Sequence, residues 1–334
     1  MNNLSPKIAP LFQQTKTVCF GRFMIDLPQS AQLVWGPMLV PYEMNVYPGK
    51  GATWINARIK ARIDKITSEK HREEPSMLIG VFNSINSDSK IVVGYENEWD
   101  SFGADLYSYI LMGNTAFVQL ISGTPLSARD PSGFKNDKTA YKEDVAYLLG
   151  IARRLRLRGE NEIPNEHGVC IEEGFIALPP SYRTEHIAIG FRFPELPDVT
   201  FAVETRNTAR PTKDSTLKAA REAGREIAEL RGLGALFGRI QTLRERNCAI
   251  GEWKGAEVLL RLPGKDGYPE SHEFDFIAPG VAKDMLRPHA KIMFYTGVKG
   301  NSRGMVPPSL TDEEAVALWD KLTSTIRVRP VNGQ

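Results

Sequence analysis

The sequence is poor in cysteine and has no closely spaced thiol motif. Its three cysteines are Cys19, Cys170 and Cys248, and none forms C-x-x-C. The usual zinc and thioredoxin spacings are therefore absent, and a full disulfide framework is impossible with an odd number. We interpret the three as small buried hydrophobes. If one bridge forms in an oxidising compartment, Cys170–Cys248 is the expected pair, because both lie in the second half of the chain.

Long apolar runs and an excess of one charge are also lacking. No stretch approaches the roughly 18 apolar residues of a membrane-spanning helix. The net charge is +2 over 334 residues, which is not the basic excess of a nucleic-acid-binding protein. The one dense basic run, 153–158 (RRLRLR), alternates with leucine and predicts an edge strand with its charges in solvent. The first residues, MNNLSPKIAPLFQQ, do not have the order of a signal peptide, so a cytoplasmic protein and a removed leader both stay open.

Residues that would carry a reaction are scattered. The five histidines form no H-E-x-x-H or other close metal pair, and His71 is expected at a solvated helix end. Adjacent carboxylates such as Glu172 and Glu173 point apart on regular backbone. We therefore predict no catalytic residue, no metal site and no cofactor.

The strongest enzymatic alternative is Ser302. It lies in Gly300-Asn-Ser-Arg-Gly304, which matches the G-x-S-x-G nucleophile elbow. That elbow requires a helix directly after the serine, but two prolines follow at 307–308. We interpret the segment as a loop.

Two halves of the chain resemble each other. Residues 19–28 (CFGRFMIDLP) align with 170–179 (CIEEGFIALP), and 151–158 (IARRLRLR) with 322–329 (LTSTIRVR). A third pair aligns 98–105 with 252–257 through Glu-Trp and Gly-Ala-acid, with two extra residues in the first copy. The ordered set indicates a duplicated domain. Cys19 and Cys170 would then occupy separate cores, with no bond between them unless their strands meet.

The residue patterns of each copy predict the same order of elements: strands, a helix, an antiparallel meander, a second helix and a closing strand. The first copy has apolar helical spacing over 54–66 and a helix over about 137–153. The second has a long helix from near 214, with apolar residues as far as Leu243, and a capping box at Thr311-x-x-Glu314. The predicted class is α+β: two similar domains, 15–158 and 170–330, each a mostly antiparallel sheet with helices on one face. The polar segment 159–169 reads as a linker.

These segments also carry a family resemblance. Cys19–Pro28, Gly168–Ile176 and Trp319–Pro330 (W-x(6)-I-R-x-R-P at its core) resemble the cognate immunity proteins of type VI secretion lipase effectors, class four, over about residues 15–330. The resemblance implies a non-enzymatic, periplasmic antitoxin with two domains. It would clamp the lid of a lipase effector, its expected partner, and be a monomer when free.

Two aromatic-bearing loops are the candidate contacts. Trp99 and Phe102 flank the two-residue insertion of the first copy, and Tyr268 lies in a Pro-Gly-rich loop of the second. Packing inside a core or loop is the alternative for all three. The competing functions are a serine hydrolase using Ser302 and a structural or adaptor protein of the cell envelope.

Overall fold

A computed structural model describes residues 4–99, 102–127, 129–130, 133–134, 138–179, 184–207, 217–230, 234–264 and 267–332. The chain divides into two compact units. The N-terminal unit contains residues 37–159 and 171–178. The C-terminal unit contains residues 1–36, 160–170 and 179–334.

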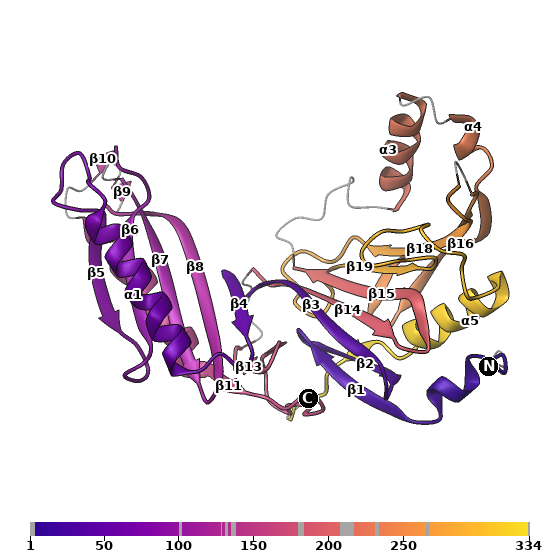
Figure 1. Ribbon diagram of the computed structural model, residues 1–334, viewed down its shortest axis with the longest axis horizontal. Coiled ribbons are helices and arrows are strands. Elements are labelled where there is room, and N and C mark those ends of the chain that lie inside the picture. The colour runs from indigo at the N-terminus through magenta and orange to yellow at the C-terminus, as the bar shows by residue number, and fades with distance from the viewer. Residues whose placement is uncertain are drawn as a thin grey trace. The chain divides into compact units, whose positions relative to one another are not determined.

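The N-terminal unit is an antiparallel sheet with two helices (Figure 1). Its strand order is β4-β8-β7-β6-β5. These strands are β4 (Glu43–Tyr47), β5 (Leu78–Asn83), β6 (Lys90–Tyr95), β7 (Gly103–Met112) and β8 (Thr115–Pro125). The helices are α1 (Ala52–Ser68) and α2 (Tyr141–Arg154), and the short strands β9 (Arg129–Asp130) and β10 (Gly133–Phe134) pair with each other. Strand β3 (Gln32–Leu39) runs across the boundary between the units.

The C-terminal unit repeats this arrangement. Its sheet has the order β14-β15-β19-β18-β17-β16. The strands are β14 (His186–Phe193), β15 (Leu196–Arg206), β16 (Gln241–Ile250), β17 (Trp253–Leu262), β18 (Ser271–Ala278) and β19 (His289–Tyr295). The helices are α3 (Leu217–Leu230), α4 (Gly234–Phe237) and α5 (Asp312–Thr323), and the short 3-10 helix η1 (Ala9–Phe12) lies near the start of the chain.

The matching strand orders support the predicted duplication. Counting along each repeat, β4, β5, β6, β7 and β8 correspond to β15, β16, β17, β18 and β19, and both sets have the same spatial order. Helices α1 and α3 precede the meander in each copy, and α2 and α5 follow it. The α+β class with mostly antiparallel sheets is confirmed. The capping box is confirmed as well: Thr311 Oγ accepts from the Glu314 N–H, and the Glu314 carboxylate accepts from the Thr311 N–H.

In the N-terminal unit the helices cover both faces of the sheet, not the one face that we predicted. In β6, Ile91 and Val93 join the cluster that contains Leu148 of α2. Val92, between them, joins the cluster that contains Ile55 of α1. Successive strand residues point to opposite faces, so α1 and α2 lie on opposite sides. The sequence alternation was weak because both faces are apolar.

Each closing strand pairs with the hairpin of the other repeat. Strand β20 (Arg327–Val328) pairs with β2 (Phe23–Pro28), which itself pairs with β1 (Thr15–Phe20). Strand β11 (Leu155–Leu157) pairs with β13 (Gly174–Ile176). The registers are equivalent: Arg327 lies opposite Met24, and Arg156 lies opposite Phe175. The repeats therefore exchange edge strands, and each compact unit contains segments of both.

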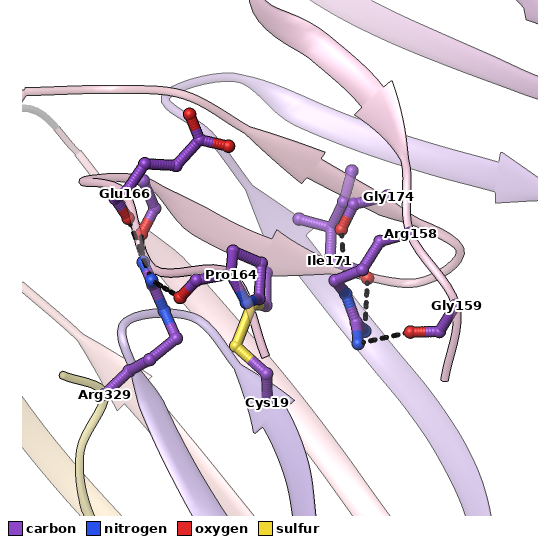
Figure 2. The surroundings of a disulfide bond; sticks show 10 residues. Cys19, Arg158, Gly159, Pro164, Glu166, Ile171, Gly174 and Arg329 are labelled. Atoms are coloured by element: carbon purple, nitrogen blue, oxygen red, sulfur yellow. Dashed lines mark hydrogen bonds between the residues drawn. A yellow bond between two sulfur atoms is a disulfide. The ribbon is translucent and has the colours of Figure 1, made fainter. Parts of the chain in front are cut away.

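A disulfide joins Cys19 to Cys170, so our expectation of Cys170–Cys248 was wrong (Figure 2). Cys248 is a free thiol. Both bonded residues are fully buried, with Cα atoms 5.8 Å apart. The reason is the turn after β1: Gly21 and Cys170 exchange two backbone hydrogen bonds of 2.8 and 2.7 Å, which brings β12 (Val169–Ile171) beside the first hairpin.

The third aligned pair, 98–105 with 252–257, is not equivalent in the structure. Trp99 lies between β6 and β7, whereas Trp253 begins β17, one hairpin earlier in the repeat. Leu243, which we assigned to the end of a long helix, lies in β16. The predicted start of that helix near 214 lies outside the described residues.

The disulfide closes a chain segment of 151 residues, so its removal should destabilise the fold. By loop-closure entropy, Cys19→Ser or Cys170→Ser is expected to lower the free energy of unfolding by about 2–5 kcal/mol. Cys248→Ser is the matched control, and it should change stability by less than about 1 kcal/mol. Denaturant melts of the three variants measure this. Equal stability of Cys19→Ser and Cys248→Ser would contradict the prediction.

Candidate partner-binding site

The predicted contact residues of the first repeat lie at the surface. Trp99 is 67% exposed and Phe102 is 71% exposed, both in the connection between β6 and β7. The Trp99 N–H donates to Asn97 Oδ1 at 2.9 Å, and the Phe102 carbonyl accepts from the Leu126 N–H at 2.9 Å. The backbone is thus hydrogen-bonded at Trp99 and at Phe102 while both aromatic residues are mostly exposed, which is the surface expected of a partner contact.

Tyr268 occupies the corresponding connection of the second repeat. It lies between β17 and β18, the equivalents of β6 and β7, and is 55% exposed. The alternative of core packing therefore does not hold for Trp99, Phe102 or Tyr268. Their role in binding a partner protein stays a prediction.

Two arginines at the ends of the closing strands have a structural role that the sequence did not reveal. Arg158 is 5% exposed and donates to the carbonyls of Ile171 and Gly174; Arg329 is 3% exposed and donates to the carbonyls of Glu166 and Gly168 (Figure 2). We had expected Arg158 to point into solvent. Instead, each guanidinium satisfies buried carbonyl groups next to a hairpin. The shared Arg-x-Arg ending of the repeats was the available signal.

Ser302 is not part of a nucleophile elbow. It is exposed, and its backbone pairs with Lys299 in a tight loop. The next helix, α5, begins ten residues later at Asp312. His272 is 3% exposed and contacts Thr296 Oγ at 2.8 Å and Asp312 Oδ1 at 2.9 Å, so it links β18 to α5.

His71 differs from our expectation of a solvated helix end. It is 7% exposed and stacks on Tyr95 with ring centroids 4.3 Å apart. Its Nδ1 accepts from the backbone N–H groups of Glu73 and Glu74. The neighbouring residues are polar, so the sequence did not indicate that His71 is buried and accepts hydrogen bonds from the backbone that follows it.

Within the described residues, no three His, Cys, Asp or Glu side chains are grouped so as to hold a metal ion. The same part of the chain contains no helix long and apolar enough to cross a membrane.

The C-terminal unit contains a large cavity that sequence reasoning missed. We call it the α3 groove; it lies between α3, α4 and the facing side of β16–β19 and has a volume of about 560 Å³. Natural ligand sites span roughly 300–1,000 Å³, so the α3 groove has the size of a binding site. Its apolar lining comes from Leu217, Phe237, Ile240, Val258, Leu260, Leu262 and Ile277.

Asp275 of β18 also lines the α3 groove. Its Oδ1 is buried and has no hydrogen-bond partner among the described residues. Burial, followed by the nearby Glu273 carboxylate, raises the pKa of Asp275 from 3.8 to about 6 against the opposing effects of Lys291 and Arg303. A buried carboxylate without a partner destabilises the free protein.

The titration of Asp275 predicts a pH-dependent stability difference. Because its folded pKa lies above the unfolded value, its contribution to stability is present below about pH 4 and is lost as the pH rises through about 6. We therefore compare the free energy of unfolding of Asp275→Asn with that of the wild type. The difference should shift in favour of the variant by roughly 2–3 kcal/mol between pH 4 and pH 7.5. Denaturant melts at both pH values test this. A pH-independent difference would contradict it.

The comparisons with known proteins cover almost the whole chain. Residues 16–158 match the model of the Tle cognate immunity protein 4 N-terminal domain, and residues 162–331 match that of its C-terminal domain. No curated protein matches the chain.

Solved structures share the fold. A chain of "the Tle4-Tli4 complex" has 24% identity and a TM-score of 0.75, covering 95% of this chain and 98% of that one. The apo immunity protein TplEi of the type VI secretion system of Pseudomonas aeruginosa has 22% identity and a TM-score of 0.73, with 95% and 98% coverage. The same protein complexed with an "L" peptide has 22% identity and a TM-score of 0.69, with 96% and 99% coverage. With both domain models matched in order, this chain belongs to the Tle cognate immunity protein 4 family.

Proposed function

We propose that this protein binds and neutralises a cognate lipase effector of a type VI secretion system. One observation carries the proposal: both domains of the immunity family are matched over 16–158 and 162–331. The family is one of immunity proteins, so the chain is not an enzyme. The Tle4–Tli4 structure, whose fold this chain shares, is a complex of such a pair.

The mechanism that fits is stoichiometric blocking of the effector. A lipase must open a lid to admit lipid, and a protein that prefers one lid state shifts that equilibrium by its differential affinity. We propose that the repeats, 15–158 and 170–330 with the joining segment 159–169, each contribute a surface that holds the lid. The exposed rings in the two equivalent loops support this, since aromatic side chains dominate the energy of many interfaces.

The first test is co-purification with the lipase and titration of its activity. We expect a 1:1 complex and loss of ester hydrolysis at equimolar inhibitor. Full lipase activity in the presence of excess protein would overturn the proposal. Ser302→Ala should neutralise as well as the wild type, because Ser302 has no role in this mechanism.

The second test concerns the aromatic loop. Trp99→Ala with Phe102→Ala should weaken binding at least thirtyfold, which corresponds to about 2 kcal/mol for a strong contact. Val81→Ala is the matched control, because Val81 is 42% exposed in the same unit. Calorimetry measures both. If the double variant and the control bind equally well, the loop is not a contact.

We also propose a periplasmic location, in agreement with the family resemblance. The buried Cys19–Cys170 disulfide supports it, because structural disulfides persist in oxidising compartments and are rare in the cytosol. Osmotic-shock fractionation followed by thiol alkylation tests this. We expect the chain in the periplasmic fraction with one alkylated thiol, Cys248. A cytosolic chain with three alkylated thiols would contradict it.

A further inference from the structure

The two helices that occupy the same position in the repeats meet their sheets differently. Helix α1 buries Ile55, Ile59 and Ile66 against the face that carries Val92 and Tyr109. Helix α3 contributes Leu217 to a smaller cluster with Val258 and Ile277. At its other end, Ile227 is 50% exposed and Leu230 is 87% exposed. Figure 1 shows α1 along the strands of its sheet and α3 directed away from its own.

Because α3 packs on its sheet at one end only, a space remains between the helix and the sheet, and this space is the α3 groove. In the first repeat this face of the sheet is a closed core, whereas in the second it is a cavity of about 560 Å³. The opposite face of the second sheet is fully closed: Phe274, Phe276 and Phe294 are completely buried. The opening is therefore confined to the α3 side and is not a general looseness of the sheet.

One group in the α3 groove, the Asp275 carboxylate, favours a basic partner. Asp275 has a buried oxygen without a partner among the described residues. The other charged side chains that line the groove are Glu273, Arg221, Arg225 and Lys291. Glu273 accepts from Arg303 at 2.7 Å, Arg221 pairs with Glu245 at 2.5 Å, and Arg225 lies 3.7 Å from Glu229. Lys291 of β19 acts on Asp275 through its charge, but Asp275 Oδ1 has no hydrogen bond among the described residues. A basic side chain entering the groove would give this carboxylate its missing partner.

The first repeat shows what kind of segment fits this face. There, isoleucines spaced four residues apart fill the sheet surface, as Ile55 and Ile59 do. An arginine of the same helix, Arg62, lies over the Tyr107 ring of β7 at 4.1 Å. The corresponding strand of the second repeat, β18, presents acids to α3 in place of such aromatic residues. An amphipathic segment with aliphatic and basic residues therefore matches both the shape and the charge.

We infer that the α3 groove receives an amphipathic segment of the effector protein, with aliphatic side chains on Val258, Leu260 and Ile277 and a lysine or arginine paired with Asp275. The inference rests on the proposed function, because the effector is the occupant. A fatty acid fits less well, because its carboxylate head cannot give Asp275 Oδ1 the hydrogen-bond donor that it lacks among the described residues.

Two variants of the full-length protein test the groove by calorimetry with the purified effector. Asp275→Asn removes the charge and should weaken binding at least thirtyfold, as expected for loss of one partner of a buried ion pair. Thr242→Trp places an indole on an exposed groove position of β16, where an aromatic residue suits a strand, and should weaken binding at least tenfold. Glu195→Gln is the matched control for charge, because Glu195 is exposed in the β14–β15 turn outside the groove; it should bind as the wild type does.

The outcomes separate the groove from the proposed function. Wild-type binding with both variants weakened supports the inference. Wild-type binding with both variants unaffected, and folded by circular dichroism, overturns the groove but leaves the proposed function intact. A wild-type protein that fails to bind the effector overturns both. Two further results would overturn the inference. If the wild type binds oleate and Thr242→Trp does not, the occupant is a lipid. If the wild type is a dimer in size-exclusion chromatography and Thr242→Trp is a monomer, the occupant is a second copy.

A pH series supplies a readout that a purely structural role would not give. Protonation of Asp275, whose pKa is raised to about 6, should weaken binding of the wild type between pH 7.5 and 5. The other charged groups that act on Asp275 are Glu273, Lys291 and Arg303, and Arg221 and Arg225 of α3 line the same groove. Because Asp275→Asn cannot titrate, the ratio of the wild-type to the variant affinity should fall by up to about tenfold over this range. A constant ratio would contradict the ion pair.

Discussion

The reciprocal pairing of closing strands with hairpins is the constraint on which the rest of this structure depends. Strand β20 completes the hairpin of the first repeat, and β11 pairs with that of the second, in equivalent register. Neither repeat is complete alone, so each compact unit requires residues from both halves of the chain. Arg158 and Arg329 then satisfy carbonyl groups beside these hairpins, and the Cys19–Cys170 bond fixes the meeting of β12 with the turn of the first hairpin.

Duplication supplied two similar sheets, and divergence of one face gave them different properties. The face under α1 became a closed apolar core, and the face under α3 kept a cavity in which the buried Asp275 Oδ1 has no hydrogen-bond partner among the residues that the structure describes. Such a carboxylate lowers the stability of the free protein. An immunity protein gains from this arrangement where the partner supplies the missing counter-charge, because the same group then contributes to affinity and to specificity.

The sequence predicted the elements well wherever a local pattern was strong. The helix at 54–66, the capping box at Thr311 and most meander strands were found, and the family resemblance was confirmed by both domain models. Prediction from the sequence failed where the same apolar spacing is compatible with either a helix or a strand. The segment around Leu243 has apolar residues that suit a helix or a strand, so the start of β16 was assigned to a helix. The Glu-Trp and Gly-Ala-acid motif recurs at different strands of the two repeats, so Trp99 and Trp253 are not equivalent.

The sequence by itself determined the repeat, the α+β class and the family, because these follow from periodicity and from ordered motifs along the chain. Tertiary structure alone decided which cysteines meet, which repeat each closing strand completes and where the α3 groove opens. Those features depend on contacts between residues far apart in the chain, such as Cys19 with Cys170 across 151 positions. CFGRFMIDLP and CIEEGFIALP are equivalent in sequence, and only the fold places their two cysteines within bonding distance.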